Sequence, residues 1–173
     1  MFATNGDHMT KHTRVTRSAL AVGLGLLLVS QILAQGSPKL AITIIDEKVN
    51  QTSEERAGQS AVTITPGDTM RYILTAANTG DAVMKNPSIV DPIPAGVEYI
   101  PLSATGANAK IQFSLDGGKT YSNWPVEYQF TNPAGKKVKK QATADMITHV
   151  KWDIKARIQP NTSRELSFQV VVK

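Results

Sequence analysis

Apolar and polar residues alternate with a period of two along most of the chain beyond residue 35. Leu40, Ile42 and Ile44 fall on one face of such a segment, and Leu166 and Phe168 fall on one face of another. This is the period of a half-buried β-strand, because successive side chains of a strand point to opposite faces. The pattern predicts strands over residues 40–45, 61–65, 70–77, 88–90, 97–102, 109–115, 126–130, 137–143, 147–158 and 164–172.

Turn-forming residues separate these strands at short intervals. Beyond residue 35 no segment carries an apolar stripe at helical spacing, and residues 51–59 are expected to form one short helical turn or a polar loop. The pattern predicts an all-β fold, an Ig-like antiparallel β-sandwich of about 7–9 strands. The residues expected to shape its turns are Pro66, Gly67, Asp68, Asn78, Gly80, Asp91, Pro94, Gly96, Asp116 and Gly118.

The N-terminal segment follows the pattern of a secretory signal peptide. Three basic residues precede a largely apolar stretch, and Ile32 and Ala34 stand at the −3 and −1 positions of a cleavage site. Met9 is an alternative start. An uncleaved anchor is the other interpretation, but the 17 uncharged positions up to Ala34 are fewer than the roughly 20 that a spanning helix needs. We predict a signal peptide over 1–34, one domain over 35–173 and no membrane span after cleavage.

Composition argues against most enzyme classes. The 173-residue chain has no cysteine, which excludes disulfides and thiol nucleophiles, and two of its three histidines precede residue 13. No Ser or Asp beside the third, His149, forms the signature of a catalytic triad. We expect no enzymatic activity and no cofactor. The alternative to the absence of a cofactor is a structural calcium ion. Its oxygen ligands would come from Asp81, Asp91, Glu98 and Asp116.

The segment from Thr65 to Pro101 carries a set of turns that is more specific than the alternation. In order they are Pro66-Gly67-Asp68, Tyr72 in the next strand, Asn78-Thr79-Gly80, and Asp91-Pro92-Ile93-Pro94-Ala95-Gly96-Val97. Over about residues 60–103 these motifs resemble the conserved-repeat domain of bacterial and archaeal surface proteins, domain of unknown function eleven. The resemblance implies an Ig-like, extracytoplasmic domain of a kind usually repeated in cell-surface or filament proteins, whereas this chain carries one copy.

Residues 114–121, Ser-Leu-Asp-Gly-Gly-Lys-Thr-Tyr, match the Asp-box pattern known from sialidase-type propellers. Asp116-Gly117 is a strong turn pair, and the Asp116 carboxylate can accept backbone N–H groups. A propeller needs several four-stranded blades, which the 139 residues after Ala34 are too few to build. The motif therefore predicts a stabilised hairpin rather than an enzyme.

Charge narrows the choice of partners. The formal net charge of +5 falls to +3 once residues 1–34 are removed. Lysines at a sheet edge deter unwanted pairing, but a lysine cluster could also contact an anionic surface such as a polysaccharide. Trp124 and Trp152 are expected either in the core or on an exposed sugar-binding platform, and readout of nucleic acid is not expected. The clustered lysines are Lys136, Lys137, Lys139 and Lys140.

Residues 39–50 form a strand that precedes a polar connector, and the recognised core begins at about Ala61. This strand, with Leu40, Ile42 and Ile44 on one face, either pairs within its own sandwich or is exchanged with a neighbour by strand addition. We expect a secreted, non-enzymatic structural or adhesive domain at the cell surface or in the periplasm. It would be a filament or matrix subunit that self-associates or contacts other surface proteins. The alternative is a carbohydrate- or matrix-binding module that uses the tryptophans and the lysine turn.

Overall fold

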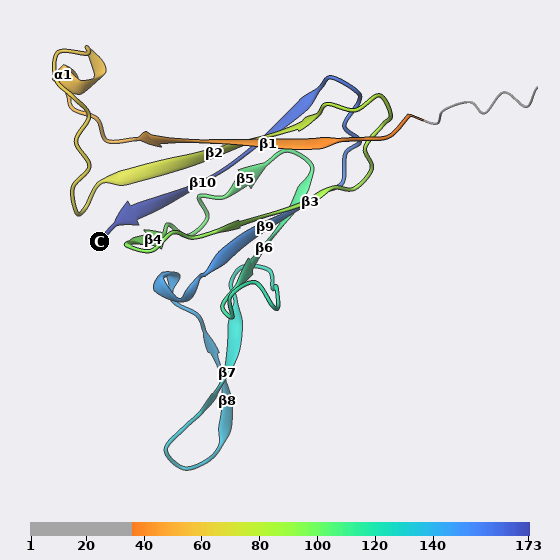
Figure 1. Ribbon diagram of the computed structural model, residues 1–173. Coiled ribbons are helices and arrows are strands. Elements are labelled where there is room, and N and C mark those ends of the chain that lie inside the picture. Colours follow the sequence, from red (N-terminus) through yellow and green to blue (C-terminus); the bar gives the residue numbers. More distant parts are fainter. Residues whose placement is uncertain (1–35) are drawn as a thin grey trace, which may run out of the picture. The chain divides into compact units, whose positions relative to one another are not determined.

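Two antiparallel sheets stack face to face in the computed structural model, which describes residues 36–173 (Figure 1). The first sheet has the order β1 (Leu40–Lys48), β2 (Thr69–Asn78), β10 (Ser163–Val172) and β4 (Val97–Tyr99), and β5 (Thr105–Gly106) also pairs with β10. The second has the order β3 (Ser88–Pro92), β9 (His149–Ile154) and β6 (Ala109–Ser114). The predicted all-β antiparallel sandwich is confirmed. Its sheets of five and three strands agree with the predicted strand number.

One hydrophobic core lies between the two sheets. The central strands β2, β10 and β9 alternate buried and partly exposed residues, as strands between a core and solvent do. Trp152, Tyr99 and Phe168 are its largest fully buried side chains. Tyr72 stacks on Phe168 with ring centroids 5.1 Å apart, and the Trp152 Nε1–H donates to the Thr105 carbonyl at 2.9 Å. The core is therefore centred on β10 and β9.

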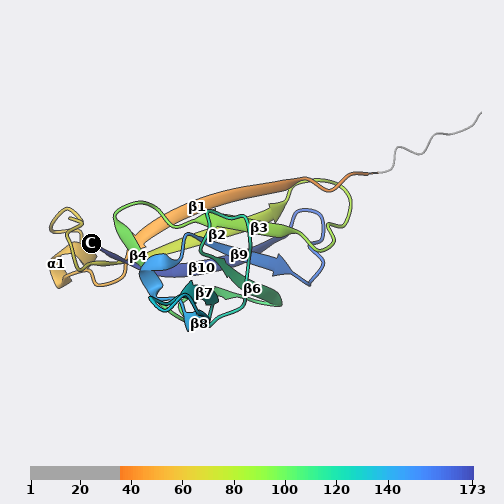
Figure 2. The same cartoon turned by 90° about the horizontal axis from the view of Figure 1, so that it is seen from below.

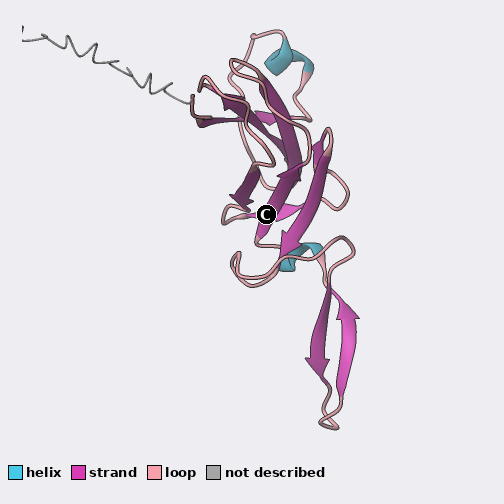
Figure 3. Ribbon diagram, turned by 90° about the vertical axis from the view of Figure 1, so that its right-hand side faces the viewer, coloured by secondary structure: helices cyan, strands magenta, loops and turns pink. Residues whose placement is uncertain are grey.

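A two-stranded hairpin, β7 (Glu127–Thr131) and β8 (Lys137–Gln141), forms a separate sheet. It is inserted between β6 and β9 and extends away from the sandwich (Figure 3). Its tip is closed by Asn132, whose side-chain oxygen accepts the Lys136 backbone N–H at 2.9 Å. A short 3₁₀ helix, η1 (Ala144–Met146), leads from the hairpin into β9.

The connector between β1 and β2 differs from the sequence prediction in one respect. Of the two alternatives for residues 51–59, a short helical turn or a polar loop, the structure shows the helical turn, α1 (Ser53–Arg56). The strand predicted over 61–65 is absent from the described structure. Here the backbone N–H groups of Thr63 and Thr65 donate to the side chains of Glu55 and Asp68 instead of to a strand. The backbone of this segment is therefore held by side-chain hydrogen bonds rather than by sheet pairing.

The turn after β2 is shaped as the sequence predicts. Asn78 is fully buried, and its side-chain oxygen accepts the backbone N–H groups of Lys39 at 3.2 Å and Gly80 at 3.1 Å. Its amide donates to the carbonyls of Ala82 and Ile158 at 2.8 and 3.0 Å. Gly67 and Gly96 have φ angles of 91° and 85°, which favour glycine.

The predicted signal peptide, residues 1–34, lies outside the described residues. Within residues 36–173 no helix has the length and apolar character needed to cross a membrane.

Candidate functional site: an open sheet edge

Strand β1 forms one complete edge of the five-stranded sheet (Figure 2). It pairs with β2 over nine residues, from Leu40 opposite Asn78 to Lys48 opposite Met70. No other strand within residues 36–173 pairs with the opposite side of β1. The predicted N-terminal strand therefore pairs internally through one side and is open along the other.

The open side exposes a row of backbone hydrogen-bonding groups. Hydrogen bonds from Thr79 N to Lys39 O and from Val49 N to Thr69 O place the odd-numbered residues of β1 in hydrogen-bonded pairs with β2. Because an antiparallel ladder alternates, the N–H and C=O groups of the even-numbered residues point away from β2. These residues are Leu40, Ile42, Ile44, Asp46 and Lys48.

The apolar side chains of β1 are more exposed than their cross-strand partners. Ile44 lies opposite Leu74 on the inner face of the sheet, yet Ile44 is 50% exposed and Leu74 is 1% exposed. Ile42 and Leu40, on the same face, are 45% and 37% exposed. The second sheet packs over the inner faces of β2 and β10. Within the described chain no residue of β1 belongs to the hydrophobic core. The sandwich thus closes its core without β1.

The other edges are shorter or interrupted. Strand β4 has three residues and is followed by Pro101 and by Leu102 at a φ of 64°, and β5 has two residues. Strand β3 ends at Pro92, which lacks an N–H group, and β6 is partly covered by a bridge between Phe113 and Ser122. Proline and short length are ways in which proteins prevent edge pairing. In the part of the chain that the structure describes, β1 alone is a long, uninterrupted apolar edge.

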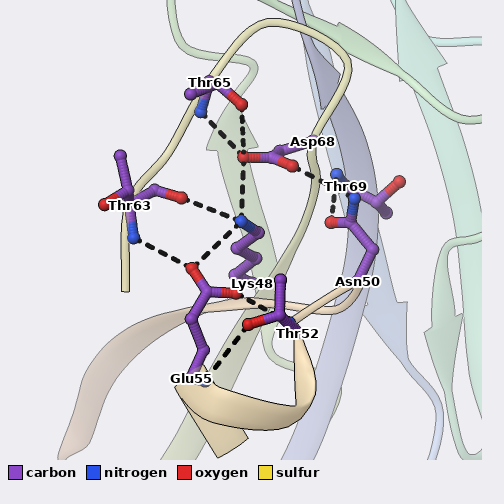
Figure 4. Close-up of polar contacts among 8 residues, drawn as sticks. All are labelled: Lys48, Asn50, Thr52, Glu55, Thr63, Thr65, Asp68 and Thr69. Carbon is purple, nitrogen blue, oxygen red and sulfur yellow. Dashed lines mark hydrogen bonds and ion pairs between the residues drawn. The ribbon is translucent and has the colours of Figure 1, made fainter. Parts of the chain in front are cut away.

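A polar cluster, which we call the latch, holds the end of β1 to the connector (Figure 4). The Lys48 ammonium lies 3.2 Å from both the Glu55 and the Asp68 carboxylates and donates to the Thr63 carbonyl at 2.9 Å. The three charged side chains are 6–10% exposed. Asn50 joins them, donating to Asp68 at 3.1 Å and accepting the Thr69 N–H at 3.0 Å.

The latch favours the charged form of each of its groups. The Thr65 backbone N–H is the main cause that lowers the pKa of Asp68 to about 2, and Lys48 and Asn50 add to it. Backbone N–H groups of Thr52 and Thr63 lower the pKa of Glu55. Burial opposes the charge on Lys48, but its bonds to Asp68 and Glu55 outweigh burial and raise its pKa. A protonated amine between two carboxylates is an ion pair and a poor nucleophile, so the latch is suited to holding β1 rather than to covalent chemistry.

Sequence reasoning missed the latch, although one part of it has a local signature. Thr52 and Glu55 form a capping box, in which Glu55 N donates to the Thr52 hydroxyl at 3.2 Å and Thr52 N donates to Glu55 at 2.7 Å. The spacing Thr-x-x-Glu is visible in the sequence. The convergence of Lys48 and Asp68 on that helical turn depends on the pairing of β1 with β2, which the sequence does not display.

The lysine cluster lies on the projecting hairpin. Lys137, Lys139 and Lys140 are exposed on β8 and Lys136 is exposed at the tip. Lys139 pairs with Glu127 at 3.2 Å, and the Lys140 ammonium lies 3.9 Å from the centre of the Phe130 ring. The hairpin carries four lysines against one glutamate, whereas positive and negative residues balance in the rest of 36–173. The net charge of the described chain is thus concentrated on this element.

The two tryptophans occupy different environments. Trp152 is fully buried in β9, so the expected core position is confirmed for this residue and the alternative, an exposed sugar platform, is wrong for it. The cause is its place in the central strand of the second sheet. Trp124 is half-buried, edge-on to Phe113 at 5.7 Å, and it borders a hollow of about 250 Å³ together with Leu102. The structure does not bring the two indoles together.

The Asp-box segment forms the hairpin loop that its sequence predicts. The Asp116 carboxylate accepts the backbone N–H groups of Lys119 and Thr120 at 3.1 and 2.9 Å, and the hydroxyls of Thr120 and Ser114 at 2.7 and 2.8 Å. Hydrogen bonds from Thr120, above all, lower the pKa of Asp116. This carboxylate is fully used in holding its own loop.

The four acidic residues considered for calcium do not converge. Asp81 accepts the Ser37 N–H at 2.7 Å, and Asp91 is buried on β3, where burial raises its pKa against the opposing effect of His149. Within residues 36–173 no three His, Cys, Asp or Glu side chains are grouped as metal ligands.

Comparison of the chain with protein-family models, curated proteins and solved structures found no match.

Proposed function

We propose that the protein is a non-enzymatic structural subunit of an extracytoplasmic assembly, and that it associates with other copies of itself by strand addition at β1. The observation that carries this proposal is the open edge of β1, with its unpaired backbone groups and half-exposed isoleucines. A long, apolar, unprotected edge strand is a template for pairing with another chain. The other edges in residues 36–173 are short or interrupted, which favours association at this one surface.

The sequence supports the proposed location independently. The signal-peptide pattern of residues 1–34 favours export, and the turns between Thr65 and Pro101 resemble a domain of surface and filament proteins. A structural subunit needs a stable fold with an adhesive edge rather than a reactive site. The latch and the Asp-box loop use their charged groups in structural contacts, as such a subunit would require.

Electron microscopy and sedimentation velocity of the purified protein, expressed as the full chain with export, test the proposal. We expect assemblies larger than one chain, whose fraction increases with concentration. Ile44→Lys should reduce that fraction, because it places a charge beside the open backbone groups. Val62→Lys is the matched control, since Val62 is 49% exposed and Ile44 is 50% exposed. Monodisperse monomers at every concentration would contradict the proposal.

A second candidate function is supported by the charge distribution. The β7–β8 hairpin carries the net charge of residues 36–173 on an element that extends from a neutral sandwich. Segregated positive charge attracts polyanions. The tip is Asn132-Pro133-Ala134-Gly135, which offers no apolar wedge for a bilayer. An acidic polysaccharide of the surrounding matrix is therefore the favoured ligand.

Binding to a polyuronate at increasing salt tests this second function. Replacing Lys136, Lys137 and Lys140 by glutamine should weaken binding and flatten its salt dependence, because fewer counterions are released. The control replaces Lys110, Lys119 and Lys155, which removes the same charge from the sandwich. Equal losses in the two triple variants would show that overall charge, and not the hairpin, binds the polymer.

A further inference from the structure

We propose that two copies of the chain pair through the outer edges of their β1 strands, antiparallel, with Ile42 of one copy opposite Ile44 of the other. The inference rests on the proposed function and adds to it the partner, the symmetry and the register. Its basis is that the open edge of β1 is complementary to itself. One two-fold contact would join two five-stranded sheets into a continuous one.

The partner of β1 must be a strand with a matching row of free backbone groups. β4 presents two outward residues, Val97 and Tyr99, because Ile100 N and Lys173 N mark the alternate positions as bonded to β10. β3 ends at Pro92, and the open sides of β7 and β8 are five residues long, with three lysines along β8. Among the strands of residues 36–173, a second β1 is the one that matches the full length of the edge.

Alternation restricts the register. The outward groups belong to even-numbered residues, so even-numbered residues must form the hydrogen-bonded pairs across the interface. Placing Ile42 opposite Ile44 aligns the strands from Lys39 to Glu47. This register sets Leu40 opposite Asp46 and Lys39 opposite Glu47. A shift of two residues one way would set Lys39 opposite Val49, and a shift the other way would set Lys39 opposite Ile45, so each shift loses the Lys39–Glu47 pair.

The preferred register also pairs opposite charges. Lys39 of each copy then faces Glu47 of the other, on the outer face at both ends of the interface. Lys39 is exposed and takes part in no ion pair among the described residues. Glu47 lies 3.2 Å from Arg71 of its own chain, so Lys39 of the second copy would complete a group of two cations around one carboxylate. Opposite charges directly across a strand pair favour that pairing.

The same register brings apolar side chains together on the inner face. Ile42 and Ile44 of one copy become direct cross-strand neighbours of Ile44 and Ile42 of the other, and each covers part of the surface that the single chain exposes. Thr43 of the two copies meets on the two-fold axis. It forms a non-hydrogen-bonded pair, in which Cα atoms are about 4.5 Å apart.

Single-cysteine cross-linking tests the register directly, because the chain has no cysteine of its own. In Thr43→Cys the Cα atoms of the two cysteines are about 4.5 Å apart. This distance lies within the Cα separation of roughly 4.4–6.8 Å that a disulfide spans. In the control Ala41→Cys, the two Cα atoms lie more than about 12 Å apart, since four residues separate them along the strand. Oxidation of the full-length protein should convert Thr43→Cys to covalent dimers at least about tenfold faster than Ala41→Cys.

Charge reversal provides a second measurement. Lys39→Glu should weaken the dimer about two- to thirtyfold in sedimentation equilibrium, because the two-fold interface contains the pair twice, and Lys39→Glu with Glu47→Lys should restore it. Lys110→Glu, the same change on β6, should have no effect. Assemblies that persist while Thr43→Cys and Ala41→Cys cross-link equally, or not at all, would overturn the register. Wild-type monomers throughout would instead overturn the proposed function.

Discussion

The two edges of the five-stranded sheet differ in length, composition and coverage. The β4 edge has three residues, and its Tyr99 is buried in the core. The β1 edge has nine residues, and none of them belongs to the core in the described chain. One edge is thus needed to close the sandwich, and the other is an addition to a sandwich that is already closed. A protein that prevented association at both edges would not leave a row of isoleucines on one of them.

The largest expected effect comes from substituting Leu74 of β2, which we compare with its cross-strand neighbour Ile44 of β1. Leu74→Ala should lower the free energy of unfolding by about 2–5 kcal/mol, because it leaves a cavity in the core. Ile44→Ala should cost less than about 1 kcal/mol, because half of that side chain is already in water. Urea denaturation of the two variants under monomeric conditions measures both values. Equal losses would mean that β1 is part of the core.

Proline substitutions at neighbouring positions of β1 should have smaller and unequal effects. Thr43→Pro removes an N–H group that faces β2 and should cost about 1–3 kcal/mol. Ile42→Pro removes an N–H group that points to solvent, so the cost should be less than half as large. Only the second variant should keep the fold of β1 while weakening self-association. If Ile42→Pro unfolds β1 as readily as Thr43→Pro, the assignment of the outward groups is wrong.

The latch should make the attachment of β1 sensitive to acid. The pKa of Asp68 is lowered from 3.8 to about 2 in the folded chain. A carboxyl with a lowered folded pKa stabilises the fold above its unfolded pKa and loses that contribution as pH falls. Protection of β1 amides should therefore decline between pH 3.8 and pH 2.

Asp68→Asn supplies the control for the acid effect. This variant should expose β1 amides to exchange already at pH 7, with a smaller further loss of protection in acid, because Glu55, whose pKa is also lowered, still loses its charge there. The difference from the unmodified protein should consequently be largest at neutral pH and vanish in acid. A difference of constant size across this range would contradict the role of the Asp68 charge.

Sequence reasoning predicted the elements that depend on local pattern. Alternation located β2 and β10, and the Asp116-Gly117 pair located a hairpin loop, because these signals lie within a few residues. The segment 61–65 was mispredicted, because side chains of Glu55 and Asp68 take the place of a paired strand. Long-range pairing decides such competition, and one sequence does not display it.

The candidate site was predicted in part for the same reason. Leu40, Ile42 and Ile44 were recognised as one face of a strand, and their exposure follows from the position of β1 at the edge. A period of two is the same in edge and central strands, so it does not distinguish β1 from β10. The buried Trp152 illustrates the converse, since its burial depends on the central place of β9.

Amide hydrogen exchange of the unmodified protein, measured residue by residue, compares the two edges of the five-stranded sheet without any substitution. In the monomer, Ile42 and Ile44 should exchange fast and Thr43 and Ile45 slowly, because hydrogen bonds to β2 protect the odd-numbered positions alone. On the opposite edge, Val97 and Tyr99 are the outward positions. Raising the protein concentration should slow Ile42 and Ile44, while Val97 and Tyr99 keep their rates. Slowing at Val97 and Tyr99 instead would place the contact at the β4 edge and refute association through β1.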